Sequence, residues 1–371
     1  MEVTYVEERT IFECVVGSTA YGINGPTSDI DKSGVMIPGI EYFYGLSKVD
    51  QFNGYPDEDK TIYEIRKALR LISDNNPNMM DLLWVPDRCV LRMTDYWQRI
   101  VDNRDLFVSK RCRYTFSGYA VAQLDRIRVH RKFLLDPPKA PPTRAETGLP
   151  EVSIFPTSQL KGVCYAAMEF LIEEEKQNFI DELDGIYGDY VVPLLARFLR
   201  PEERALAMEW LQLGIKSQAH AFQSVGTQYI KDEYIDLAHK ELSYYNASRE
   251  YSRYMDWKKS RNKARAPMEE KFGYDTKHAG HLVRLMRMGE EILRTGKVNV
   301  DRTNIDAEEL KAIRAGAWTY EKIEEYAHAK DKKFEELYKT SDLPRSVDVN
   351  QINALCIETV DRYHKKTEIT A

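Results

Sequence analysis

A chain of 371 residues is long enough for two domains, or for one domain with a large helical extension. Its 43% hydrophobic residues suffice for a substantial core, and its 30% charged residues are typical of a soluble protein. The net charge of −6 excludes a protein that binds nucleic acid through its overall charge, so the local distribution of charge matters more.

No window of the sequence reaches the roughly 18 apolar residues of a membrane span. Residues 1–10 contain three glutamates and no apolar run, so we expect neither a membrane segment nor a signal peptide. The five cysteines are scattered without a paired metal-binding spacing, which predicts reduced core thiols in a cytosolic protein: Cys14, Cys89, Cys112, Cys164 and Cys356.

Up to about residue 64 the chain consists of short β-type segments broken by Gly, Pro and Asn turns. The apolar run Ile11–Val16 predicts a strand, a turn follows, and two aspartates then begin a second strand. Because side chains alternate along a strand, Asp29 and Asp31 should share one face while Ile30 points into the core. Residues 59–63 are expected to form a neighbouring strand.

From Ile65 the pattern becomes helical. A helix over Ile65–Ser73 should bury Ile65, Leu69 and Ile72 and end before Pro77, because proline cannot continue a helix. Asn78 is the expected N-cap of the next helix. Another helix is predicted over 107–130, and the prolines of residues 135–142 require an extended loop. Later helices are predicted over 158–178, 185–199, 201–223, 229–256, 276–295 and 307–330.

The strongest functional signal is a Gly-Ser turn that is followed closely by two alternating aspartates. Mg²⁺ favours a few carboxylates together with water and phosphate oxygens. Two such ions roughly 3.5–4 Å apart can stabilise the entering and the leaving oxygen of an in-line displacement. Gly17 lets the backbone approach a triphosphate, Ser18 adds a hydroxyl donor, and the following amides form a small anion nest. Each half of the pattern is common by chance, whereas the combination predicts Mg²⁺-dependent nucleotidyl transfer.

A third carboxylate should lie on a strand beside the two aspartates. Asp59, at the start of the predicted strand, is the preferred candidate. Glu64 is the alternative, although its position before a helix also suits a first-turn charge that the helix dipole favours. Asp57 and Glu58 fit a solvated turn better.

Gly17-Ser18 with Asp29 and Asp31 resembles the signature of the DNA polymerase β-type nucleotidyltransferase superfamily. The longer strings resemble predicted nucleotidyltransferases of bacteria and phages that are linked to RNA ligases and RNA repair. Later segments resemble further blocks of that family, and the resemblance extends from about residue 11 to about residue 320: residues 17–22, 28–35, 63–71, 76–84, 136–150 and 274–285.

The resemblance implies an α+β fold, in which a polymerase β-like core with a mixed sheet and flanking helices precedes a large, mostly helical region. We expect the nucleotidyltransferase core over 1–135 and a Pro-rich loop over 136–157. A helical domain over 158–371 should complete the nucleotide and acceptor site.

Two basic segments are candidates for contact with nucleic acid. Residues 104–132 contain eight Lys or Arg, two Asp and interleaved aromatic residues, which together suit single-stranded RNA. The alternative is an amphipathic helix whose rings face the core and whose charges face water. A second basic run, residues 258–265, fits either an RNA contact or a surface segment.

In the block of residues 277–285, helical spacing places Lys277, His281 and Arg284 on one face, with His278 close by. Positive side chains there would offset the charge that grows on a leaving pyrophosphate. Gly280 would open space for a base or a phosphate. Two alternatives remain for the histidines: hydrogen bonds in a helix–helix seam, or a zinc site for which no third ligand is visible.

The sequence thus predicts transfer of a nucleoside monophosphate from an NTP to an acceptor hydroxyl, with release of pyrophosphate. Asp29, Asp31 and Asp59 would hold two Mg²⁺ ions, with Mn²⁺ as a substitute. The resemblance implies an RNA end, of tRNA or another RNA, as the acceptor, and an RNA ligase as a partner. The location would be a bacterial cell or the cytosol of a phage-infected host. The alternatives are transfer to a protein or a small molecule, or an inactive RNA-binding protein.

Overall fold

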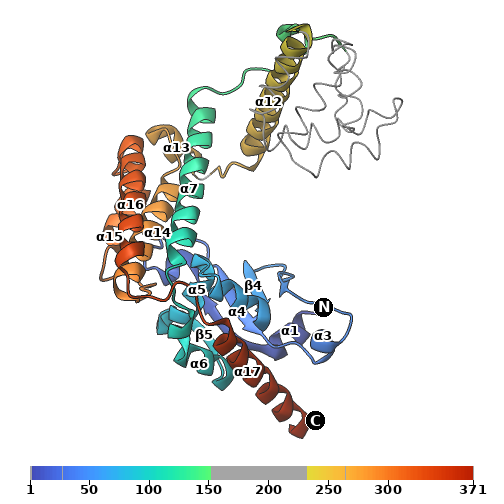
Figure 1. Cartoon of the computed structure of the whole chain (residues 1–371), viewed down its shortest axis with the longest axis vertical. Helices are drawn as coiled ribbons and strands as arrows, with labels where there is room; N and C mark the ends of the chain where they lie inside the picture. The colour runs from blue at the N-terminus through green and yellow to red at the C-terminus, as the bar shows by residue number, and fades with distance from the viewer. Residues whose placement is uncertain (1, 27, 152–231, 264, 371) are drawn as a thin grey trace, which may run out of the picture. The chain divides into compact units, whose positions relative to one another are not determined.

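The computed structural model describes residues 2–26, 28–151, 232–263 and 265–370 (Figure 1). Residues 1–136 and 262–371 form one compact unit, and residues 137–261 form a second. The predicted helices over 158–178, 185–199 and 201–223, and Cys164, lie outside the described residues. The predicted division of the chain at residues 135 and 157 stays a prediction.

A five-stranded mixed sheet lies in the first unit, as predicted. The strand order is β3-β4-β2-β1-β5. β1 pairs antiparallel with β2 and β5, β2 pairs parallel with β4, and β3 pairs antiparallel with β4. The strands are β1 (Thr10–Val15), β2 (Lys32–Met36), β3 (Gln51–Phe52), β4 (Lys60–Glu64) and β5 (Val90–Met93).

Most of the helices that precede residue 136 lie around this sheet, whereas the last of them, Cys112–Leu135, packs against the C-terminal helices (Figure 1). Phe12 of β1 stacks on Trp97 of α6 with ring centroids 5.1 Å apart, so an apolar core joins sheet and helix. The helices are α1 (Val3–Arg9), α2 (Gly17–Ala20), α3 (Glu41–Tyr44), α4 (Ile65–Ser73), α5 (Pro77–Trp84), α6 (Asp95–Asp102) and α7 (Cys112–Leu135), with 3₁₀ turns at Asp87–Cys89 and Arg104–Phe107.

Helix α4 has the predicted bounds and buries the predicted apolar face. The predicted cap of α5 was wrong. Asn76, in an extended conformation, accepts hydrogen bonds from the backbone N–H groups of Asn78 and Met79, and Pro77 occupies the first helical turn. Proline suits this position because the first N–H groups of a helix have no partner within the helix.

The C-terminal segment is helical and belongs to the same unit as the sheet. α14 packs against α7, α15 and α16, while α17 packs against α4 and α6 (Figure 1). Every helix in the described ranges is too short or too polar to cross a lipid bilayer. The helices are α13 (Ala266–Phe272), α14 (Thr276–Thr295), α15 (Ala307–Arg314), α16 (Tyr320–Thr340) and α17 (Val349–Thr370).

Helix α14 has the predicted bounds, whereas the single helix predicted over 307–330 was wrong. The chain forms α15 and α16 instead, with a break at Gly316. Gly316 has a φ of +91°, a left-handed conformation that interrupts a right-handed helix.

In the second unit, the Pro-rich stretch contains no helix before the 3₁₀ turn Ala145–Thr147, which confirms the predicted extended loop. Helix α12 (Asp232–Ser260) forms the rest of the described part of this unit. The guanidinium of Arg144 lies over the ring of Tyr244 at 5.4 Å, which connects the segment after the loop to α12.

Candidate active site

The candidate site is built at the edge of the sheet where β2 and β4 begin. Because Lys32 pairs with Lys60 in these parallel strands, the preceding residues Asp31 and Asp59 lie side by side. The N–H of Lys32 donates to the carbonyl of Asp59 at 2.8 Å. On the other side, the N–H of Val16 donates to the carbonyl of Asp31 at 2.9 Å. The backbone therefore brings the Gly17 turn and both carboxylates together, and the predicted neighbouring strand is confirmed.

The predicted strand position of the aspartate pair was wrong, because β2 begins only at Lys32. Residues 28–31 have no regular secondary structure, so strand alternation does not set their directions. Ile30, which was expected in the core, is 62% exposed.

The pKa of Asp31 shows that this carboxylate interacts electrostatically with the other two aspartates. Burial raises the pKa of Asp31, the negative charge of Asp59 raises it further, and Lys277 counteracts both. Asp29 also raises the pKa of Asp31, but more weakly than Asp59 does. In the described part of the chain, one group of three acidic or histidine side chains has ligand atoms that all lie within 4.8 Å of one another. This group does not include the three aspartates. The three aspartates are thus spread more widely than the ligands of a compact single-ion site.

Gly17 meets a steric requirement in this site. Its φ of +66° is left-handed, and a Cβ at this position would lie 2.8 Å from Oδ2 of Asp31. Glycine therefore lets the turn lie directly against the carboxylate. Ser18 follows in α2, with its side chain partly buried.

Replacing Gly17 by alanine is expected to lower the rate of nucleotide transfer, the activity that the sequence predicts for this site, at least about tenfold. A left-handed non-glycine residue costs roughly 1–2 kcal/mol, and the new Cβ displaces the Asp31 carboxylate. The measurement is the rate of nucleotide transfer. Gly25→Ala is the matched control, because Gly25 is exposed in the same loop and lacks a positive φ. An equal loss in both variants would contradict the steric explanation.

Glu64, the alternative third carboxylate, lies at the opposite end of β4. It is buried, it caps α4 by accepting from the N–H of Lys67 at 3.1 Å, and it pairs with Arg66 at 2.8 Å. Glu64 lies five positions along the chain from Asp59, a distance of about 16 Å in an extended strand. The geometry therefore favours Asp59 as the third carboxylate.

Tyr21, which follows the Gly17 turn, forms a buried cluster with Asp81 and Arg284. The hydroxyl of Tyr21 donates to Oδ2 of Asp81, and the guanidinium of Arg284 lies 3.7 Å from the Tyr21 ring centroid. Burial raises the pKa of Asp81 to about 6, against the opposing charge of Arg284 and the tyrosine hydrogen bond. Sequence reasoning singled out only Arg284. Tyr21 and Asp81 lie inside the sequence blocks that resemble the nucleotidyltransferase family. This position was the signal that could have identified them.

The loop between α14 and α15 and the end of α15 both bind the backbone that follows the Gly17 turn. The N–H of Arg302 donates to the carbonyl of Tyr21 at 3.1 Å, and Arg314 donates to the carbonyl of Ile23 at 2.8 Å. The predicted role of Gly280 was wrong. A Cβ there would lie 2.6 Å from Cγ of Arg314, so this glycine admits a neighbouring side chain rather than a ligand.

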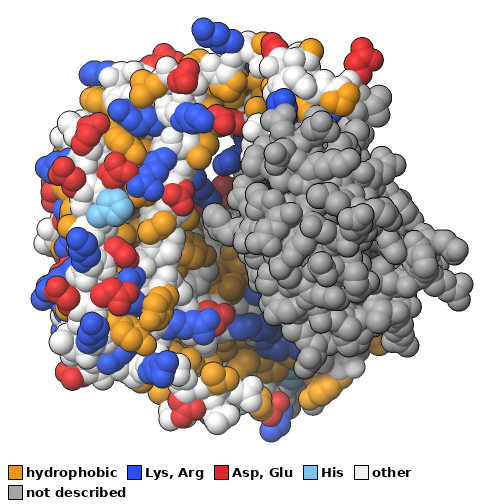
Figure 2. Space-filling view, turned by 45° about the horizontal axis from the view of Figure 1, so that its top comes forward, with side chains coloured by type: hydrophobic (Ala, Val, Ile, Leu, Met, Phe, Trp, Pro, Cys, Tyr) orange, Lys and Arg blue, Asp and Glu red, His pale blue; other side chains and the backbone are white. Residues whose placement is uncertain are grey.

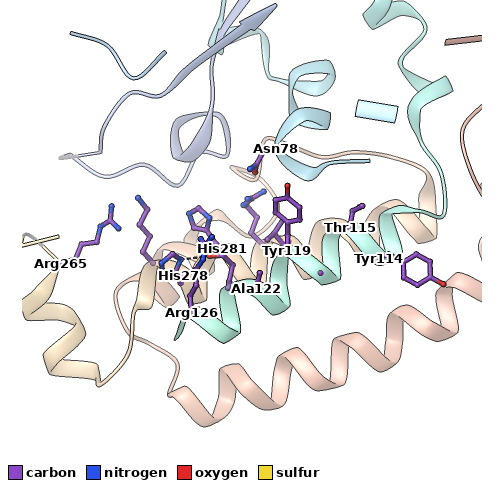
Figure 3. A pocket seen from close by; sticks show the side chains of 14 residues that line it. Asn78, Tyr114, Thr115, Tyr119, Ala122, Arg126, Arg265, His278 and His281 are labelled. Atoms are coloured by element: carbon purple, nitrogen blue, oxygen red, sulfur yellow. Dashed lines mark hydrogen bonds between the residues drawn. The ribbon is translucent and has the colours of Figure 1, made fainter. Parts of the chain in front are cut away.

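A groove of about 850 Å³ lies between α7, α14 and the start of α5. In Figure 3, Asn78 faces Tyr119 of α7 and His281 of α14 across this groove. Four predicted nucleotide-binding residues line it: Lys277, His278, His281 and Arg284. Lys277 connects the groove to the acidic site, since its charge acts on Asp31.

The groove is lined by cationic side chains and by a histidine that carries no charge. Burial lowers the pKa of His281 to about 2, and nearby cations add to the effect, so this imidazole is neutral at pH 7. The pKa of Lys277 is also lowered, by burial and by Arg265 and Arg314. The groove thus combines concentrated positive charge with a neutral ring.

Part of the basic segment over 104–132 serves packing. Phe107, Phe116 and Phe133 are buried. Arg113 pairs with Asp331 at 3.0 Å and Glu335 at 2.6 Å. The face drawn in Figure 2 likewise shows Lys and Arg interspersed with Asp and Glu. Tyr119 and Arg126 line the groove and remain candidates for contact with RNA.

The comparisons with known proteins cover part of the chain. A family model, described as the RNA repair pathway DNA polymerase beta family, matches residues 2–134. A relative in enterobacteria phage T4, an uncharacterized 38.9 kDa protein of the nrdC-mobD intergenic region, is 23% identical over 133 residues. That match spans 33% of this chain and 39% of the phage protein. No solved structure matches the chain.

The matched segment contains the whole sheet, the Gly17 turn and the three aspartates. The resemblance of residues beyond 134 stays a prediction. Residues 2–134 thus match the RNA repair pathway DNA polymerase beta family, and the predicted resemblance to polymerase β-type nucleotidyltransferases is confirmed over that segment.

Proposed function

We propose that this protein transfers a nucleoside monophosphate from an NTP to the hydroxyl of an RNA end. The acceptor hydroxyl loses its proton to water as its oxygen bonds to the α-phosphorus, the bond from the α-phosphorus to the bridging oxygen breaks, and pyrophosphate leaves. One observation carries the proposal: Asp31 lies beside Asp59, against the Gly17 turn, with the charge of Lys277 acting on it. The matched family, polymerase β-like and part of an RNA repair pathway, implies a nucleotidyltransferase.

The acidic residues fit divalent metal ions. The raised pKa of Asp31 beside Asp59 indicates carboxylates that repel each other when both are ionised. A cation would relieve this repulsion, and carboxylate oxygens are the ligands that Mg²⁺ prefers. Asp29, Asp31 and Asp59 would hold two ions, whose ligands need not converge on one point. When bound, the ions would supply positive charge at the reacting phosphate and lower the pKa of the acceptor hydroxyl.

The residues of the groove would bind and orient the substrates. Lys277 would attract the triphosphate and offset the charge of the leaving pyrophosphate, and Arg284, buried against Tyr21, would add positive charge at longer range. His281, which stays neutral, would hydrogen-bond to the nucleotide without adding charge, with His278 beside it. Tyr119 offers an exposed ring for stacking with a base, and Arg126 offers a cation for a phosphate of the acceptor.

The test is incubation of the full chain with Mg²⁺ and NTPs radiolabelled at the α-phosphate, together with RNA or with protein acceptors. Label in RNA, lost in Asp31→Asn, supports the proposal. Label in protein or in a small molecule would overturn the RNA acceptor and keep the chemistry. RNA binding without any transfer of label, in wild type and variant alike, would indicate an inactive RNA-binding protein.

The third carboxylate can be assigned with a pair of variants. Asp59→Asn is expected to lower the transfer rate at least about 100-fold, because it removes a charged metal ligand. Glu64→Gln should leave the rate within about threefold and lower the free energy of unfolding by about 1 kcal/mol, because Glu64 caps a helix. Transfer rates and denaturant unfolding measure the two effects. The reverse pattern would assign the role to Glu64.

A further inference from the structure

A second cluster of potential metal ligands lies where α7 meets the start of α14. Ligand atoms of His130, Asp275 and His278 all lie within 4.8 Å of one another. Nε2 of His278 is 3.4 Å from Oδ2 of Asp275, and the His130 and His278 rings have centroids 5.9 Å apart. His130 and Asp275 are 145 positions apart in the sequence, so only the packing of α7 on α14 brings them together.

The donor set suits zinc. Zn²⁺ binds imidazole nitrogen and carboxylate oxygen at about 2.0–2.2 Å, with tetrahedral geometry. Two tetrahedral ligands at that bond length lie about 3.3–3.5 Å apart. The separation of 3.4 Å between His278 and Asp275 already has this value. Mg²⁺, which prefers oxygen ligands, suits this cluster less well than the three aspartates.

The surroundings orient both α14 ligands. Nδ1 of His278 lies 2.7 Å from Oε1 of Gln123, an oxygen that can only accept, so Nδ1 carries the hydrogen and the lone pair of Nε2 is directed at the cluster. Metal-binding histidines usually donate their second ring N–H in this way. Asp275 accepts from the N–H of His278 through Oδ1, which leaves Oδ2 for the cluster. Burial also lowers the pKa of His278, which favours the neutral ring that metals bind.

We propose that His130, Asp275 and His278 bind one Zn²⁺ ion, separate from the Mg²⁺ ions at the aspartates. The ion would connect α7 to the N-terminus of α14 beside the groove, because His278 lines that groove as well. Three protein ligands leave one tetrahedral position for water or for an oxygen of a bound molecule. The proposal concerns binding and does not depend on nucleotidyl transfer.

The experiment uses the full chain, stripped of metal with a chelator and dialysed. Zn²⁺ binding is measured by competition with a chromogenic indicator, and Co²⁺ absorption reports the ligand type. Wild type is expected to bind one Zn²⁺ per chain with a tetrahedral, nitrogen- and oxygen-ligated Co²⁺ spectrum. His130→Ala and His278→Ala should each weaken binding more than about 100-fold. Gln123→Leu should weaken it about 10-fold to 100-fold, because it removes only the orienting hydrogen bond.

Three further variants keep the result interpretable. Asp275→Asn should weaken zinc binding while preserving the cap of α14, because asparagine is also a good N-cap. The exposed His328→Ala is the matched histidine control, and Asp31→Asn tests the other acidic site; both should bind zinc as wild type does. Circular dichroism confirms that each variant is folded. Zinc binding unchanged in His130→Ala and His278→Ala, binding lost in Asp31→Asn, or a sulfur-ligated Co²⁺ spectrum would overturn the proposal.

Discussion

Replacing Asp31 by asparagine is expected to lower the rate of nucleotide transfer at least about 1,000-fold, which corresponds to about 4 kcal/mol of transition-state stabilisation. Asp31 lies at the centre of the candidate site: Gly17, Asp59 and Lys277 all act on or lie against its carboxylate. Asparagine retains the size and one oxygen of the side chain but removes the negative charge that would hold a divalent cation. The measurement is single-turnover transfer of a labelled nucleotide at saturating Mg²⁺.

Asp57→Asn is the matched control for this experiment. Asp57 is an exposed aspartate in the turn before β4, two residues from Asp59, and it should be replaceable with a change in rate of less than about twofold. A rate of Asp31→Asn within a few-fold of wild type would remove the basis for the enzymatic proposal. Recovery of that rate at higher Mg²⁺ would instead show that Asp31 serves mainly in metal affinity.

Replacing Arg302 by methionine is expected to destabilise the first unit by about 3–5 kcal/mol, because it leaves the partly buried Glu291 without this cation and Asp306 with Arg287 as its remaining partner. The Arg302 side chain is fully buried. It pairs with Glu291 at 2.7 Å and with Asp306 at 2.8 Å. Its backbone N–H also donates a hydrogen bond to the carbonyl of Tyr21. Unfolding of this loop would therefore remove a contact of the turn beside the aspartates.

Denaturant unfolding measures the effect, with Arg294→Met as the control. Arg294 forms an ion pair of the same type with Glu290, four residues earlier on α14, but its side chain is 48% exposed. Exposed pairs contribute about 0.3–0.5 kcal/mol, so this variant should remain close to wild type. Equal losses of stability in the two variants would show that burial of Arg302 is not the cause.

Much of this architecture follows from local sequence. The apolar run before Gly17, the strand after Asp59 and the helices α4 and α14 were predictable because each depends on periodicity and on nearby proline or glycine residues. The exact ends of helices were less predictable where a single residue determines them. Asn76 rather than Asn78 caps α5, and Gly316 divides α15 from α16.

Side-chain partners were harder to predict than elements. Tyr21, Asp81 and Arg284 lie in three separate motif blocks, and nothing local indicated that they meet in one buried cluster. The basic residues of α7 looked like an RNA-binding surface. Arg113 shows what the pattern leaves open, since periodicity indicates which face a residue occupies but not whether carboxylates of another helix pair with it.

The sequence by itself determined the chemical repertoire: a glycine turn, closely spaced aspartates and a helix rich in cations and histidines. Only the tertiary structure decided which of these groups act on one another. Parallel pairing of β2 with β4 set Asp59 beside Asp31, and packing of α14 on α7 brought His130 to Asp275 and His278. The physical reason is that residue types and spacing specify local conformation, whereas contacts between distant segments arise only when buried faces pack together.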